Sequence, residues 1–177
     1  SATDLAPDVA QMWVTFAALN MRLPNAARSR HLAEMALQRA VQLKSEDPAV
    51  ARLYARIRLI NGRYAEAAQA YASLLDTDRE ETIALELDHM ILAFVKAGMP
   101  SLGEQVFDRY LQNHPDSAPI HVARAIMLRA QLADGLARKA IANALAVPRV
   151  SIQTQKSAQT LLAHWKANPS KRQRRED

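Results

Sequence analysis

Apolar residues recur along most of this chain three or four positions apart, which is the spacing of an amphipathic helix. The clearest stretch, residues 48–79, holds two such runs, 49–60 and 64–75. Asn61-Gly62 separates the two runs, and an Asn-Gly pair is a strong indication of a turn. The pattern therefore predicts two helices that pack together as a hairpin.

The second run of this stretch places a small residue four positions before a large one, at Ala67 and Tyr71. Small residues allow two helix backbones to approach to about 8–10 Å, and large side chains fill the space beside the contact. Three further stretches repeat this small-x3-large spacing, at Ala33 and Leu37, at Gly103 and Phe107, and at Ala137 and Ile141. The recurrence predicts a row of similar hairpins, with their large residues and Leu74 buried between the layers.

Helix-turn-helix units with this spacing and a length of about 34 residues resemble the tetratricopeptide repeat. Two stretches fit that repeat well, 48–79 with Gly62 at its turn and 84–115 with Gly98 at its turn. The first helices lack the Trp and the Leu-Gly pair of the repeat. Related solenoids of helical hairpins therefore stay open as a structural alternative.

Two degenerate units and a final helix extend the resemblance over residues 8–167. The unit at 8–45 has a regular second helix, and the unit at 118–148 has Asp134-Gly135 at its expected turn. The helix expected at 151–167 would cover the end of the row, with polar residues on its outer side. The resemblance implies an all-α fold, namely a right-handed α-α superhelix of about four helical hairpins with this helix as a C-terminal cap.

Composition agrees with a helical repeat domain. Of the 177 residues, 49% are hydrophobic and 23% are charged, which suffices for one domain with a continuous core. No stretch approaches the ~18–20 apolar residues of a membrane-spanning helix. The absence of cysteine excludes a disulfide framework and a thiolate metal site. The chain begins Ser1-Ala2-Thr3 without an initiator Met, which is consistent with a preceding signal, anchor or domain.

The net charge of +5 comes partly from the C-terminal sequence SKRQRRED. Residues 168–177 are therefore expected to form a disordered basic tail, and residues 1–7 a linker or a disordered segment. The remaining excess of positive charge is small for a nucleic-acid-binding surface. In an alternative reading, the chain is a repeat-type regulator or a self-assembling scaffold whose tail contacts nucleic acid or an anionic membrane.

The resemblance also implies a concave groove, lined by the first helix of each repeat, that binds a peptide, a helix or a subunit. The phase of the helices predicts the following groove residues: Arg52, Arg56, Leu59, Leu85, Asp88, His89, Leu92, Lys96, Val122 and Ile126. Arg52 and Arg56 stand one turn apart and could together bind a carboxylate, so an acidic or C-terminal segment of a partner is expected. A solvated basic face is the alternative. The Lys and Asn carboxylate clamp of some family members is not matched, because Leu53 stands where Asn would be required.

No catalytic motif is present. The chain lacks HExxH, a glycine-rich phosphate loop and G-x-S-x-G. Asp88 and His89 are adjacent on a predicted helix and point about 100° apart, so they cannot easily share one metal ion. We therefore expect a non-enzymatic protein without a metal site or a cofactor.

The first predicted helix, residues 8–22, provides a second candidate surface. It has no preceding repeat to cover its outer side, so Met12, Trp13, Phe16 and Leu19 are expected to mediate association, for example between two copies of the chain. Arginine outnumbers lysine and alanine is abundant, which is typical of bacterial chains from GC-rich genomes. For a bacterial chain, the resemblance to the repeat family implies an assembly, secretion or maturation scaffold, with the envelope or periplasm favoured over the cytoplasm.

Overall fold

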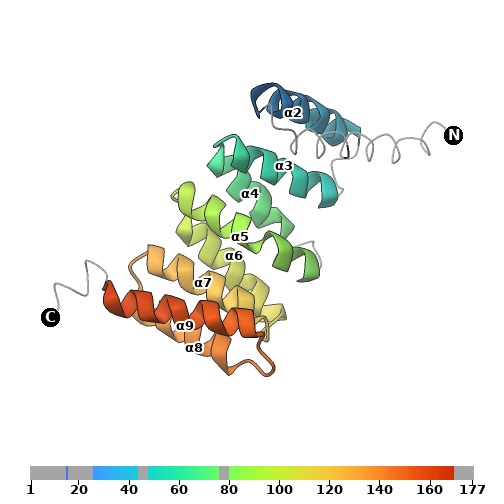
Figure 1. Cartoon of the computed structure of the whole chain (residues 1–177). Coiled ribbons are helices and arrows are strands. Elements are labelled where there is room, and N and C mark those ends of the chain that lie inside the picture. The colour runs from blue at the N-terminus through green and yellow to red at the C-terminus, as the bar shows by residue number, and fades with distance from the viewer. Residues whose placement is uncertain (1–14, 16–25, 44–47, 76–79, 170–177) are drawn as a thin grey trace. The chain divides into compact units, whose positions relative to one another are not determined.

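A computed structural model of the chain describes residues 15, 26–43, 48–75 and 80–169. The regular elements of these ranges are all α-helices (Figure 1). In chain order they are α2 (Ala26–Leu43), α3 (Pro48–Ile60), α4 (Tyr64–Leu74), α5 (Glu80–Lys96), α6 (Pro100–Asn113), α7 (Ala118–Ala130), α8 (Asp134–Ala146) and α9 (Ile152–Ala167). The predicted all-α class is confirmed for the described residues. No helix within them is long and apolar enough to span a membrane.

Contacts divide the chain into two compact units, with the boundary after Asp78. The first unit contains α2, α3 and α4, and α3 packs against both of its neighbours. The second unit contains the helices from α5 to α9. The repeat domain predicted for residues 8–167 stays a prediction, and most of its first helix, residues 8–22, lies outside the described residues.

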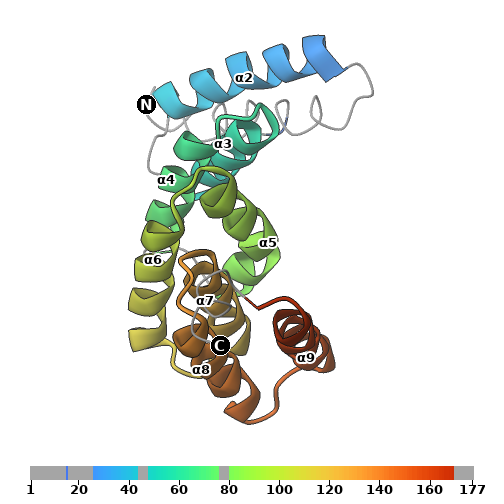
Figure 2. The ribbon, with the colours of Figure 1, turned by 90° about the vertical axis from the view of Figure 1, so that its left-hand side faces the viewer.

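Neighbouring helices of the second unit pack in the order expected for successive hairpins. Helix α6 contacts α5 and α7, and α8 contacts α7 and α9. Helices α5 and α9 also contact α7, so α7 lies between them. Figure 2 shows α9 on the side of α7 that faces away from α6. This repeat-like arrangement is compatible with a helical repeat solenoid.

The small-x3-large pairs form the core of each hairpin. Ala67 and Tyr71 in α4 are both fully buried, and so are Ala137 and Ile141 in α8. The remaining pairs are buried as well, namely Ala33 with Leu37 in α2 and Gly103 with Phe107 in α6. Leu74 is also buried, so the predicted burial of the large residues is confirmed.

The turns between paired helices share one backbone geometry. Gly62, Gly98 and Leu132 adopt the left-handed conformation, with φ of 76°, 67° and 63°. In each turn the N–H of this residue donates to the carbonyl three residues earlier at 3.0–3.1 Å, and the next N–H donates to the carbonyl five residues earlier at 2.8–3.0 Å. These paired bonds form the Schellman motif, which satisfies the last carbonyls of a helix. The three hairpins therefore close in the same way.

The position predicted for the last of these turns is wrong. Asp134-Gly135 was expected there, but α8 begins at Asp134 and the turn is formed by Gln131, Leu132 and Ala133. Leu132 occupies the left-handed position that glycine holds in the other two turns. Because leucine rarely adopts this conformation, the nearby Asp-Gly pair was the stronger turn indication in the sequence.

Candidate functional site

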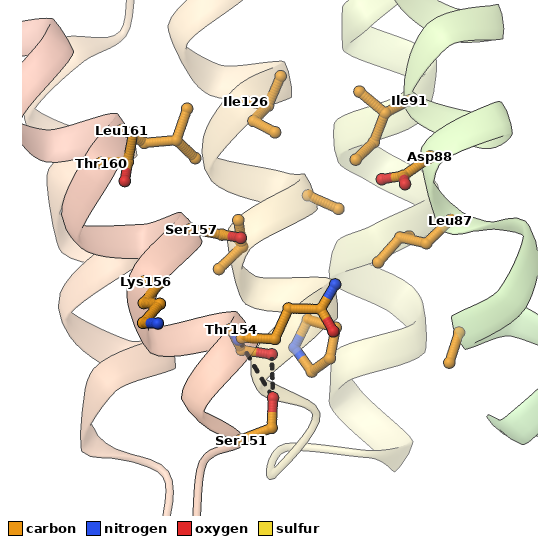
Figure 3. Close-up of a pocket in the computed structure, with 15 residues that line it drawn as sticks. Leu87, Asp88, Ile91, Ile126, Ser151, Thr154, Lys156, Ser157, Thr160 and Leu161 are labelled. Carbon is orange, nitrogen blue, oxygen red and sulfur yellow. Dashed lines mark hydrogen bonds between the residues drawn. The ribbon is translucent and has the colours of Figure 1, made fainter.

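A cleft of about 690 Å³ opens in the second unit, between α5 and α9 and above α7 (Figure 3). Figure 3 shows Leu87, Asp88 and Ile91 pointing from α5 toward α9, and Ser157 and Leu161 pointing from α9 toward α5. The full lining consists of Ala84, Leu87, Asp88, Ile91, Pro119, Val122, Ala123, Ile126, Ser151, Gln153, Thr154, Lys156, Ser157, Thr160 and Leu161.

Helices α5 and α7 supply most of the apolar lining of the cleft through the same residue spacing. On α5 the lining residues stand at positions 84, 87, 88 and 91, and on α7 they stand at 119, 122, 123 and 126. Residues at this spacing share one face of a helix. Seven of these eight side chains are apolar, and the eighth is Asp88. The cleft thus combines an apolar floor with a single carboxylate on the α5 side.

The α9 wall is polar and rich in hydroxyl groups. Its stripe of short side chains includes Thr154, Ser157 and Thr160, of which Ser157 and Thr160 are exposed. Ser151 caps the helix, because its Oγ accepts a hydrogen bond from the Thr154 N–H at 3.1 Å. Short hydroxyl side chains leave room for another backbone, and they can donate to and accept from its peptide groups.

The position of α9 is fixed at its C-terminal end by Arg129 of α7. The Arg129 guanidinium pairs with Asp134, donates to the Asn168 carbonyl at 2.6 Å and lies 5.7 Å from the centre of the buried Trp165 ring. Arg129 does not contribute to the lining of the cleft. Its charge is instead used to hold α7, the start of α8 and the end of α9 together.

The predicted groove residues of the second unit divide between the cleft and other surfaces. Asp88, Val122 and Ile126 line the cleft. Leu85 and Leu92 are exposed and do not contribute to the lining, nor do the other two predicted residues of α5, His89 and Lys96. The cleft face of α5 therefore lies about one residue, or 100°, from the predicted face, whereas the face of α7 agrees with the prediction.

The His89 side chain contacts a residue of its own helix, α5, and does not line the cleft. Its Nδ1 lies 3.3 Å from the Oε2 of Glu86, one turn earlier on α5. No group of three or more His, Cys, Asp or Glu side chains within the described residues is arranged to hold a metal ion.

The predicted groove residues of the first unit lie on α3. Arg56 is exposed, Arg52 is half-buried and both take part in interactions within the chain. Leu59 is buried and therefore belongs to the core, so its predicted place on the groove surface is wrong. The second predicted surface, formed by Met12, Trp13, Phe16 and Leu19, lies outside the described residues. Whether either set binds a partner stays a prediction.

Sequence reasoning missed a third arginine of α3, Arg58, which is buried at the junction of the three helices. It pairs with Glu34 of α2, and its Nε lies 3.2 Å from Oε2 of Glu66 in α4. Its guanidinium also lies 4.7 Å from the centre of the Tyr54 ring, and the Tyr54 hydroxyl donates to Glu66 at 3.2 Å. Burial lowers the pKa of Arg58, but Tyr54 and the two carboxylates outweigh burial, so the net pKa is raised.

The polar wall of the cleft was also missed, because residues 151–167 were expected to act only as a cap. Polar residues were expected on the outer side of that cap, yet Gln153 lines the cleft, and the apolar Ile152 is exposed. The recurrence of Ser151, Thr154 and Ser157 every third residue could have indicated a continuous polar face.

Comparisons of the chain with protein-family models, with curated proteins and with solved structures give no match.

Proposed function

We propose that the chain is a non-catalytic scaffold that binds a segment of a partner protein in the cleft formed by α5, α7 and α9. The common turn geometry and the buried small-x3-large pairs support its assignment as a solenoid like the tetratricopeptide repeat proteins. In such a solenoid the hairpins form a right-handed superhelix, and the first helices of successive hairpins face the partner.

The observation that carries this proposal is the composition of the cleft. Its volume of about 690 Å³ falls within the range of specific binding sites, which combine an apolar lining with a few placed polar groups. The floor from α5 and α7 would take up apolar side chains of the partner. The hydroxyl groups of α9 would bond to its peptide groups, which an extended segment leaves unpaired.

Binding can be tested by selecting short peptides from a random display library on the full chain and measuring their affinity by calorimetry. Ser157→Trp should abolish binding, because an indole at this exposed position would fill the cleft. Gln159→Trp is the matched control, since Gln159 is exposed on the same helix and does not line the cleft. A peptide that binds all three proteins equally would place the binding site elsewhere. Failure to select any peptide would contradict the proposal as a whole.

A further inference from the structure

The Asp88 carboxylate is the described acidic group of the second unit that lies in the cleft lining. Glu104 and Asp108 of α6 both pair with Arg124, at 2.8 and 2.6 Å, and Asp134 pairs with Arg129. Asp88 is exposed and its carboxylate, like that of the exposed Asp116, makes no hydrogen bond or ion pair with a described residue, but Asp88 lies in the cleft lining and Asp116 does not. Figure 3 shows it between Leu87 and Ile91, with apolar side chains on both sides.

We propose that the partner segment places a basic side chain, lysine or arginine, against Asp88 while its apolar residues cover the floor of the cleft. This inference rests on the proposed function and specifies the chemistry of its ligand. A partner that covers Asp88 removes water from the carboxylate, which is costly unless an opposite charge arrives with it. Apolar surroundings also strengthen the attraction between the two charges relative to open water.

The second charge of the lining gives the segment an orientation. Asp88 on α5 and Lys156 on α9 are the charged residues of the lining, and they come from opposite walls. The lining is therefore neutral overall, and selection depends on where a charge sits along the partner rather than on its net charge. A segment with a basic residue toward α5 fits this arrangement, and one with an acidic residue there is repelled.

The occupant is expected to be a segment of another protein. The chain's own tail, residues 170–177, is basic but contains no apolar residue that could cover the floor. Alternating apolar and polar residues with one lysine or arginine would satisfy both the floor and Asp88.

The test uses a selected peptide in three versions that differ at one position, with Lys, Gln or Glu. The parent chain should prefer the Lys version over the Glu version by about tenfold or more. Asp88→Asn should remove this preference, and Asp88→Lys should reverse it. Asp116→Lys is the control with the same charge change, since Asp116 is exposed and outside the lining, and it should leave the preference intact.

The possible results separate this inference from the proposed function. In one outcome, the parent chain binds the Lys, Gln and Glu versions with equal affinity at every peptide position, yet Ser157→Trp abolishes binding. The cleft then binds peptides, but Asp88 does not select a basic residue. If a charge preference survives in Asp88→Asn, the basic group contacts another residue and the inference is also wrong. Tighter binding of the Lys version that is lost in Asp88→Asn and reversed in Asp88→Lys would support it.

Discussion

Gly103 lies where α6 packs tightly against Phe94 of α5 and Met127 of α7, which makes it a sensitive test of the packing. A Cβ atom at this position would lie 2.7 Å from the Sδ of Met127 and 2.9 Å from the Cγ of Phe94. The thioether can shift, but the Phe94 ring is fully buried and packs edge-on against Phe107 at 5.8 Å. Replacement of Gly103 by Ala therefore forces a rearrangement of the core.

The expected magnitude follows from two opposing effects. Overpacking of a core costs about 1–3 kcal/mol, whereas Gly→Ala inside a helix gains about 1 kcal/mol. Because the ring has no free space, we expect the cost to lie near the upper end and Gly103→Ala to lose about 1–2 kcal/mol of unfolding free energy. Gly103→Val should lose more, since it adds further atoms at the same contact.

Urea denaturation followed by circular dichroism measures this difference. Gly135→Ala provides a control in the same unit, because Gly135 is an exposed helical residue and a Cβ there would meet no atom within 4 Å. It should gain about 0.5–1 kcal/mol. If Gly103→Ala were as stabilising as Gly135→Ala, the close approach of α6 to its neighbours would be refuted.

Two further substitutions test the first unit. Arg58→Ala should lower the unfolding free energy by about 2 kcal/mol, because it removes the buried cation of the network and leaves Glu34 and Glu66 to the exposed Arg63 alone. A loss as small as that expected for the exposed Arg56→Ala, about 0.5 kcal/mol, would contradict this network. Tyr71→Ala should lower it by about 3–5 kcal/mol through the cavity it creates, and a neutral effect in thermal or chemical unfolding would mean that the phase of α4 is wrong.

The repeat core could be predicted from the sequence because close helix packing restricts residue size. Close packing requires a small residue at Ala67 and a large one at Tyr71, one helical turn later. This spacing can be recognised in the sequence alone. The turns at Gly62 and Gly98 were equally recognisable, since glycine is the residue best suited to their left-handed conformation.

The cleft could be predicted only in part, because its face depends on how each helix is rotated. The face of α7 was predicted through Val122 and Ile126, but α5 is rotated so that Ile91 rather than Leu92 faces the cleft. Apolar residues occur on several sides of α5, so hydrophobic spacing alone did not determine which side is covered. Arg58 was missed for a related reason, since its burial depends on Glu34, a residue 24 positions away in the sequence.

The common left-handed turn geometry of the three hairpins is the central structural claim, and the three turn positions test it most directly. Gly62→Ala and Gly98→Ala should each lower the unfolding free energy by about 1 kcal/mol, because alanine is strained in the left-handed conformation. Leu132→Gly should have the opposite sign and be more stable than Leu132→Ala, which controls for loss of the partly exposed side chain. If chemical denaturation gave Leu132→Gly an unfolding free energy no higher than that of Leu132→Ala, the common left-handed turn geometry of the three hairpins would be contradicted.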